Sequence, residues 1–156
     1  MHDNSMKLMA YFRDKYLLEL MGCTILDVGA RKVKRRHRCY RELFKLDYGY
    51  FGMDIVPGRN VDIVGYEAIG DRVFDVVISG QTMEHINRPW EWLKMLKQYF
   101  AKYICIIAPN KFSEHRYPID TYRYFPDGMR DLFECAGVIP LEIFKDKADT
   151  IGIGTK

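Results

Sequence analysis

Two histidines and two carboxylates are the side chains whose types and positions suggest chemistry. Histidine is the residue type that titrates near neutral pH, so either His85 or His115 could accept a proton from a hydroxyl or an amine. Asp27 and Asp54 each follow a short apolar run, as an acid does when a buried strand carries it to a ligand site. These residue types predict proton abstraction beside a pocket for a polar ligand.

Residues 24–30, with the sequence TILDVGA, contain the first of these acids. The apolar run is typical of a buried strand, and Gly29 directly after it lets the backbone approach a ligand closely. Ligands of open α/β sheets collect at the carboxyl ends of the strands. The stretch therefore predicts the floor of a nucleotide-type pocket, with a buried strand that simply turns at a glycine as the alternative.

Asp54 ends the second apolar run in the same way. Nucleotide-binding α/β proteins place an acid there to accept hydrogen bonds from ribose hydroxyls, about 20 residues past the glycine. Either carboxylate alone could be a helix cap or a surface acid, but two in this order favour a nucleotide site. The G-x-G-x-x-G pattern is missing, which disfavours a nicotinamide dehydrogenase.

Length and composition indicate one domain, residues 1–156, of an ordinary globular class. Hydrophobic residues make up 48% and charged residues 29% of the chain, and no apolar run approaches the roughly 20 residues of a membrane span. The first residues lack the basic and apolar pattern of a secretion signal, so we expect a cytoplasmic protein without a membrane partner. The four cysteines are far apart and form no C-x-x-C pair, so no metal site is expected.

Residues 31–38 form a basic run that carries most of the excess positive charge. The formal net charge of +3 is by itself too small to predict nucleic-acid binding. The run falls in the loop and first turn before a predicted helix, where the helix dipole disfavours cations. A phosphate, an acidic substrate or nucleic acid would offset that cost, and a solvated charged turn is the alternative.

Alternating elements complete the predicted α/β fold. Residues 1–22 form a leading helix that packs on the sheet or covers the pocket, because apolar residues recur there at helical spacing. Further helices are predicted at 39–46, around 90–96 and at 127–136, and strands at 24–28, 50–54, 61–64, 74–79, 103–109, 139–144 and 149–155.

Two segments that connect the predicted elements give further information about the fold and the site. The short charged turn before residue 149 requires the last two strands to be antiparallel, since parallel neighbours need a crossover of a dozen residues or more. The connection at 110–126 is long and rich in histidine, arginine, tyrosine and aspartate. Loops of that length are usually functional when they are ordered.

The element order resembles that of the class I S-adenosylmethionine-dependent methyltransferases over nearly the whole chain. More narrowly, four strings look like the type 11 group of methyltransferase domains: YRELF at 40–44, GMDIVPGRNVDIV at 52–64, FDVVISGQTMEHI at 74–86 and HRYPIDTYRYFPDGM at 115–129. The resemblance implies a Rossmann-like, mostly parallel seven-stranded sheet with an antiparallel C-terminal hairpin and helices on both faces.

The resemblance also implies S-adenosylmethionine as cofactor, lying across the ends of the first, second and fourth strands. Asp27, Gly29 and Ala30 would bind the cofactor, with Gly29 and the backbone around Ala30 approaching the methionine moiety. Asp54 would bind the ribose hydroxyls, and the neighbouring Ile55 would touch the adenine face. A further cofactor contact near the sulfonium would come from the residue after the fourth strand, Gln81.

The chain departs from the family pattern at two of these positions. Arg31 stands where the family usually has further glycines; its side chain could narrow the methionine site or pair with the cofactor carboxylate. The family often has an acid after the third strand to hold the adenine amine, and here only Glu67 could take that role.

Five residues are candidates for the site that binds the methyl acceptor and takes its proton. In the family pattern His85 begins a helix, which gives it a structural alternative, and His115 lies in the long loop as the preferred base. Tyr117, Tyr122 and Arg123 would shape the acceptor pocket or hold an anionic acceptor, or pack the loop onto the sheet. The predicted function is methyl transfer to a hydroxyl or amine of a small-molecule or saccharide acceptor. Alternatives are a cofactor-binding or scaffold protein without turnover, and a methyltransferase for RNA or a phosphorylated acceptor that uses the basic run.

Overall fold

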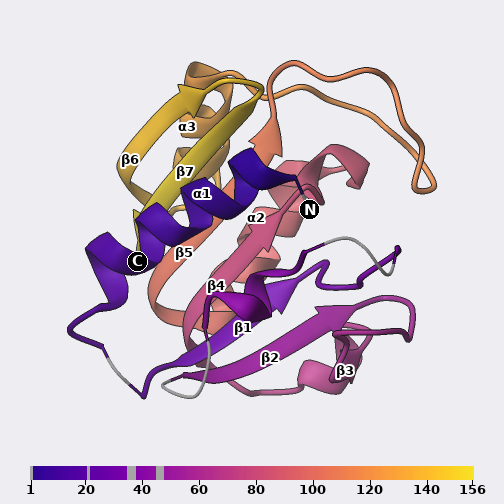
Figure 1. Cartoon of the computed structure of the whole chain (residues 1–156). Coiled ribbons are helices and arrows are strands. Elements are labelled where there is room, and N and C mark those ends of the chain that lie inside the picture. Colours follow the sequence, from indigo (N-terminus) through magenta and orange to yellow (C-terminus); the bar gives the residue numbers. More distant parts are fainter. Residues whose placement is uncertain (1, 21, 35–37, 45–47) are drawn as a thin grey trace.

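The computed structural model describes residues 2–20, 22–34, 38–44 and 48–156. Its centre is one seven-stranded sheet in the order β3-β2-β1-β4-β5-β7-β6, in which β7 runs antiparallel to both its neighbours and the other pairs are parallel (Figure 1). The strands are β1 Thr24–Val28, β2 Gly49–Asp54, β3 Ile63–Val64, β4 Phe74–Gly80, β5 Phe100–Pro109, β6 Ile139–Asp146 and β7 Asp149–Thr155.

Helices cover both faces of the sheet, as the sequence predicts. The α1 helix, Asp3–Phe12, continues into a π-helical turn, Arg13–Leu17, and packs against β5 and β7 on one face. The other face carries α2, Pro89–Tyr99, and α3, Pro126–Cys135, which also contact each other (Figure 1). The described residues therefore form the Rossmann-like sandwich expected from the sequence.

Two apolar clusters, one on each face, hold the layers together. Leu26 and Val28 of β1 point toward α2 and α3, whereas Ile25 points toward α1. This alternation follows from the two-residue period of a strand, and burial on both faces explains why β1 and β5 are nearly continuous apolar runs. In α1, the spacing of Met6, Met9 and Phe12 places their side chains in the core.

The predicted helix at 39–46 is wrong over its described part. Residues 39–44 contain only a 3₁₀ turn, Tyr40–Glu42, and residues 45–46 lie outside the described part of the chain. The Tyr40 side chain is fully buried, with its hydroxyl on Ser5 and against the backbone of Gly80. Anchoring Tyr40 there, with β2 beginning at Gly49, leaves little chain for a helix.

The strand order brings the predicted site residues to one edge. Because β1, β2 and β4 are parallel, their carboxyl ends lie on the same side of the sheet. The strand order reverses between β1 and β4, the kind of place where α/β proteins bind ligands. Among the described residues, no helix has the length and apolar character that crossing a membrane requires.

Candidate functional site at the carboxyl edge of the sheet

The turn after β1 is joined to the end of β2. The backbone N–H groups of Gly29 and Ala30 both donate to the carbonyl of Met53, at 2.9 and 3.0 Å. Gly29 has φ of 82°, a left-handed conformation that favours glycine. A Cβ on Gly29 would also stand 2.1 Å from Oγ1 of Thr82, so a second chain segment packs directly against this turn.

Asp54 lies on this edge next to the Gly29 turn. Its carboxylate accepts hydrogen bonds from the backbone N–H groups of Arg31, at 3.3 Å, and Val56, at 3.0 Å. The guanidinium Nε of Arg31 is 3.7 Å from the same carboxylate and has no hydrogen-bond acceptor among the described residues. The Arg31 side chain thus lies beside the predicted ribose-binding acid.

Ile55 and Glu67 surround Asp54. Ile55 is 65% exposed, so its apolar side chain is accessible to a flat ring. Glu67 begins the 3₁₀ turn Glu67–Ile69, and its side chain is exposed. The N–H of Gly65, two residues earlier, donates to the Asp54 carbonyl at 2.9 Å, which brings this turn to the same corner.

Gln81 follows β4 and is tied into the fold. It has φ of 55°, and its side-chain amide donates to Oδ1 of Asp149 at 2.9 Å. Asn4 of α1 donates to the other oxygen of Asp149, at 2.8 Å, so this buried carboxylate joins β4, β7 and the first helix. In this conformation the Gln81 amide stabilises the hairpin turn.

Asp27 is buried in the sheet, with 1% of its surface exposed. Its carboxylate accepts a hydrogen bond from the Tyr50 hydroxyl on the neighbouring strand. Burial raises the pKa of Asp27 to about 7, and the Tyr50 hydrogen bond partly opposes that shift. This carboxylate therefore faces the protein interior and positions the turn that follows it.

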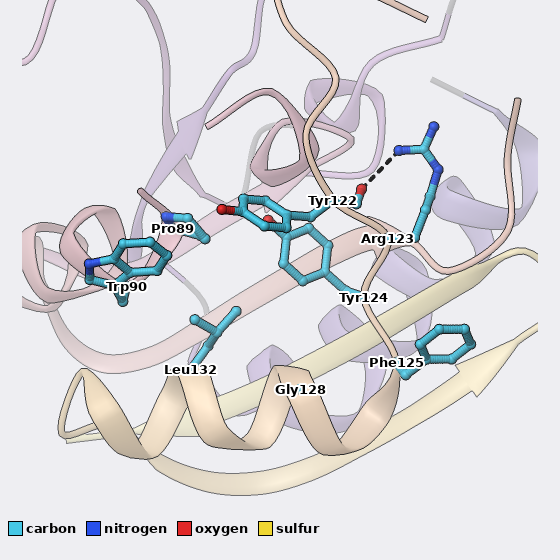
Figure 2. A pocket seen from close by; sticks show the side chains of 8 residues that line it. All are labelled: Pro89, Trp90, Tyr122, Arg123, Tyr124, Phe125, Gly128 and Leu132. Atoms are coloured by element: carbon cyan, nitrogen blue, oxygen red, sulfur yellow. Dashed lines mark hydrogen bonds between the residues drawn. The ribbon is translucent and has the colours of Figure 1, made fainter. Parts of the chain in front are cut away.

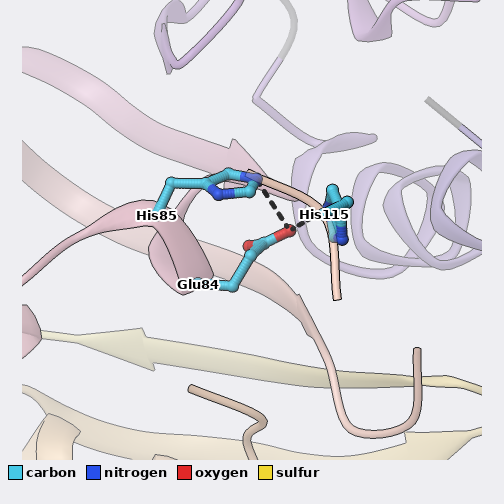
Figure 3. A group of neighbouring side chains, drawn as sticks. All are labelled: Glu84, His85 and His115. Carbon is cyan, nitrogen blue, oxygen red and sulfur yellow. Dashed lines mark ion pairs between the residues drawn. The ribbon is translucent and has the colours of Figure 1, made fainter. Parts of the chain in front are cut away.

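Glu84, His85 and His115 form a cluster beyond β4 (Figure 3). Glu84 and His85 belong to the 3₁₀ turn Met83–His85, and His115 comes from the long loop. Oε1 of Glu84 lies 3.7 Å from Nε2 of His85 and 3.9 Å from Nε2 of His115. The tertiary structure thus brings the two predicted base candidates together around a third group.

Backbone contacts position each member of this cluster. Nδ1 of His85 is 2.5 Å from the Ile119 carbonyl, and the N–H of Thr121 donates to the Glu84 carbonyl at 2.8 Å. Nδ1 of His115 is 3.1 Å from the Ser113 carbonyl. The loop is therefore held to the turn after β4, with both Nε2 atoms on the side of the carboxylate.

Asp120 supports His115 from within the loop. Its carboxylate accepts the backbone N–H of His115 at 2.7 Å, and Arg123 binds it through two nitrogens at 2.6 and 2.7 Å. This bidentate pair holds the pKa of Asp120 well below its usual range. The loop segment between His115 and Arg123 is consequently closed on itself by charged hydrogen bonds.

Burial dominates the electrostatics of the cluster. Glu84 is 0% exposed, and neither of its carboxylate oxygens has a hydrogen-bond donor among the described residues. Removal from water raises the pKa of Glu84 to about 8, and burial also lowers the pKa of His85, which favours its neutral form. A buried acid without donors is unusual and needs a physical explanation.

The three predicted acceptor residues divide between two places. Tyr117 is 53% exposed and packs its ring 6.0 Å from that of His85 and 6.3 Å from that of His115. Tyr122 and Arg123 instead line a pocket of about 300 Å³ between the loop, α2 and α3. Figure 2 shows that aromatic and apolar side chains dominate this pocket, which Pro89, Trp90, Tyr124, Phe125, Gly128 and Leu132 complete.

The basic run is partly neutralised by the fold. Lys32 and Arg38 lie 3.9 and 3.3 Å from Glu42, and Arg31 lies 3.7 Å from Asp54. Residues 35–37 of the run fall outside the described residues. Three of the run's described cations thus have an acid of the same chain beside them.

Sequence reasoning missed Glu84, Thr82 and Asp120. Glu84 adjoins His85, and an acid next to a candidate base was the signal that could have found it. Thr82 and Asp120 act through packing and loop closure, which have no pattern in the sequence.

The sequence matches no family model and no curated protein. Solved structures with the same fold do match. A SAM-dependent methyltransferase from Aquifex aeolicus has a TM-score of 0.62 at 16% identity, covering 96% of this chain and 97% of that one. Magnesium protoporphyrin IX methyltransferase from Synechocystis, with bound SAH, has a TM-score of 0.67 at 13% identity, covering 98% and 82%. The [4+2]-cyclase SpnF has a TM-score of 0.70 at 12% identity, covering 97% and 81%.

At these identities the likeness is one of fold. The chain has the class I fold of the SAM-dependent methyltransferases, and crystals of such neighbours contain SAM or SAH. The presence of a cyclase among them means that the fold does not by itself decide the reaction.

Proposed function

We propose that the chain is an S-adenosylmethionine-dependent methyltransferase that modifies a hydroxyl or amine of a small-molecule or saccharide acceptor. The observation that carries this proposal is the corner formed by Gly29, Asp54 and Ile55. A left-handed glycine, a carboxylate and an exposed apolar side chain meet there at the ends of two adjacent parallel strands. The type 11 group is the proposed family.

The residues at this corner fit the adenosyl half of the cofactor. The Asp54 carboxylate can accept hydrogen bonds from two ribose hydroxyls, Ile55 offers an apolar surface to adenine, and Glu67, exposed two residues after Gly65, is the candidate partner of the adenine amine. Arg31 must turn away from Asp54 for the ribose to bind. Its guanidinium is then free for the carboxylate of the methionine moiety, which Gly29 and Ala30 would approach.

The protein does not have to activate the methyl group, because the cofactor, when bound, supplies a methyl group already activated by a sulfonium. A lone pair on the acceptor oxygen or nitrogen forms the new bond to carbon. The carbon–sulfur pair stays on sulfur, and the acceptor releases one proton. The task of the chain is to hold the acceptor in line and take that proton.

The Glu84, His85 and His115 cluster is the proposed proton acceptor of this site. Thr82, which contacts Gly29, lies only two residues before Glu84, so the cluster adjoins the cofactor corner. Tyr117 borders the cluster, and Arg123 connects it through Asp120 to the aromatic pocket. We assign the acceptor to this side of the long loop.

A second candidate function, cofactor binding without turnover, is favoured by two contacts. The Thr82 side chain fills the space beside Gly29, and the Arg31 guanidinium lies beside the Asp54 carboxylate. Both contacts reduce the room for a cofactor at this corner. An RNA or phosphorylated acceptor is less favoured, because acids of the same chain pair with Lys32 and Arg38.

Calorimetric titration with SAH tests the cofactor site. Replacing Asp54 with alanine removes charged hydrogen bonds to the ribose, so we expect binding to weaken by about 1–3 kcal/mol, or roughly 5- to 150-fold. Asp71→Ala removes an exposed acid before β4 and serves as the charge-matched control with unchanged affinity. Equal affinity in folded Asp54→Ala would contradict the placement of the ribose.

Methyl transfer is tested with radiolabelled SAM and a panel of hydroxyl and amine acceptors. The variant His115→Ala should slow turnover while SAH affinity stays unchanged, because His115 lies outside the cofactor corner. Tight SAH binding without transfer to any acceptor would support the scaffold alternative instead.

A further inference from the structure

The cluster of Glu84, His85 and His115 has the composition and geometry of a metal site. We propose that these three side chains bind one divalent first-row transition ion, of the kind that zinc represents. Imidazole and carboxylate together suit such ions, and two histidines with one glutamate leave coordination positions open for water or substrate. The scattered cysteines, on which the expectation of no metal rested, take no part.

The distances between the ligand atoms of the three side chains are somewhat longer than those between the ligands of a bound metal ion. In a tetrahedral zinc site with bonds of about 2.0–2.2 Å, two ligand atoms lie about 3.3–3.5 Å apart. Oε1 of Glu84 is 3.7 Å from Nε2 of His85 and 3.9 Å from Nε2 of His115. The ligand atoms of the three residues all lie within 4.8 Å of one another, so the widest gap has to close by at most about 1.5 Å to complete the set.

The buried carboxylate of Glu84 is the strongest argument. It is 0% exposed, and both its oxygens lack hydrogen-bond donors among the described residues. An uncompensated buried charge is strongly destabilising, and a protonated Glu84 would have a donor with no acceptor among the described residues. A cation between the three side chains satisfies the carboxylate in a way that no described protein group does.

The outer contacts of the imidazoles favour the same assignment. Nδ1 of His85 lies 2.5 Å from the Ile119 carbonyl, and Nδ1 of His115 lies 3.1 Å from the Ser113 carbonyl. Because a carbonyl only accepts, the neutral tautomer that these contacts favour has its proton on Nδ1 and leaves the Nε2 lone pair for an ion. Metal-ligating histidines in proteins are commonly oriented in this way.

An alternative explanation is a pair of salt bridges from charged imidazoles to Glu84. It leaves the carboxylate without any hydrogen bond at 3.7 and 3.9 Å, whereas charged hydrogen bonds are usually 2.7–2.9 Å long. His85 and His115 side chains remain 12% and 29% exposed. Solvent can therefore reach the imidazole side of the cluster, where an open coordination position belongs.

Metal binding goes beyond the proposed function and does not depend on it. If methyl transfer is the reaction, which is the part that rests on the proposed function, a divalent ion here would bind a hydroxyl acceptor and lower its pKa. His85 and His115 would then serve as ligands instead of bases, and the bound acceptor would release its proton to water on the exposed imidazole side of the cluster.

The test titrates zinc chloride into tag-free, chelator-treated protein by calorimetry, and repeats it with cobalt chloride to read the visible absorption of the bound ion. We expect one ion per chain. Glu84→Gln and His115→Ala should each weaken binding by at least about 10- to 100-fold, the range for even outer-shell partners of metal sites. His2→Ala changes a histidine outside the cluster, whose ring lies 5.0 Å from that of Phe112 in a tilted arrangement, and should bind like the wild type.

Several results would overturn the inference: no binding by the wild type, wild-type affinity in both cluster variants, or an equal loss in His2→Ala. Wild-type affinity in both cluster variants would place the ion elsewhere, for example on a cysteine. Because His115 lies in the loop, His115→Ala keeps the test usable if Glu84→Gln does not fold. SAH titration of the metal-free protein examines the cofactor site separately, so failure of one proposal leaves the other standing.

Discussion

Replacing Asp27 with asparagine should change how stability depends on pH. The carboxylate is buried in β1 against Tyr50, and burial raises its pKa from 3.8 to about 7. The folded protein therefore binds this proton more tightly than the unfolded chain. Stability from this group is highest at about pH 4 and falls as pH rises, until it levels off above pH 7.

The size of the effect follows from the shift. A difference of about 3 pKa units, at 1.36 kcal/mol each, makes the wild type about 4 kcal/mol less stable at pH 8 than at pH 4 through Asp27 alone. The asparagine variant lacks this loss. Its extra amide N–H groups cost about 1–3 kcal/mol at every pH if they stay unpaired, so the pH trend is the diagnostic quantity.

Urea unfolding of both proteins from about pH 4 to about pH 8 measures this trend. The free energy of unfolding of Asp27→Asn should increase relative to that of the wild type as the pH rises. Asp75→Asn is the opposite control: hydrogen bonds from Thr24 and Lys102 lower the pKa of Asp75, so its stability is lost as pH falls. A constant gap for Asp27→Asn would refute the buried, proton-binding carboxylate. Since Asp27 faces Tyr50, its SAH affinity should stay unchanged.

Two other perturbations address the cofactor corner. Gly29→Ala should lower the unfolding free energy by at least about 1–2 kcal/mol, because its backbone is left-handed and Thr82 occupies the Cβ position. Gly128→Ala, in α3 with open space around it, should raise it by about 0.5–1 kcal/mol, and equal thermal shifts in the two variants would contradict this geometry. Arg31→Gln should weaken SAH binding by calorimetry, because it removes the guanidinium proposed to pair with the carboxylate of the methionine moiety; tighter binding would show that Arg31 only competes with the cofactor for Asp54.

The sheet was predictable because its signals are local. Apolar runs such as residues 103–109 and the short turn before Asp149 reveal strands and their direction without knowledge of the rest of the chain. The helix expected at 39–46 was not formed over its described part, because the place of Tyr40 is decided by Ser5 and Gly80, which are distant in sequence. Local periodicity cannot register such a contact.

For the candidate site, the sequence by itself determined that Gly29 and Asp54 follow strands and that two histidines could exchange protons. Only the tertiary structure decided that Arg31 lies on Asp54 and that the histidines converge on a buried glutamate. Each strand ends where its backbone hydrogen bonding to the neighbouring strands ends, and the apolar runs of the sequence indicate these positions. The meeting of His85 with His115 depends on how the long loop folds back over β4, and that is settled by packing and burial across the whole molecule.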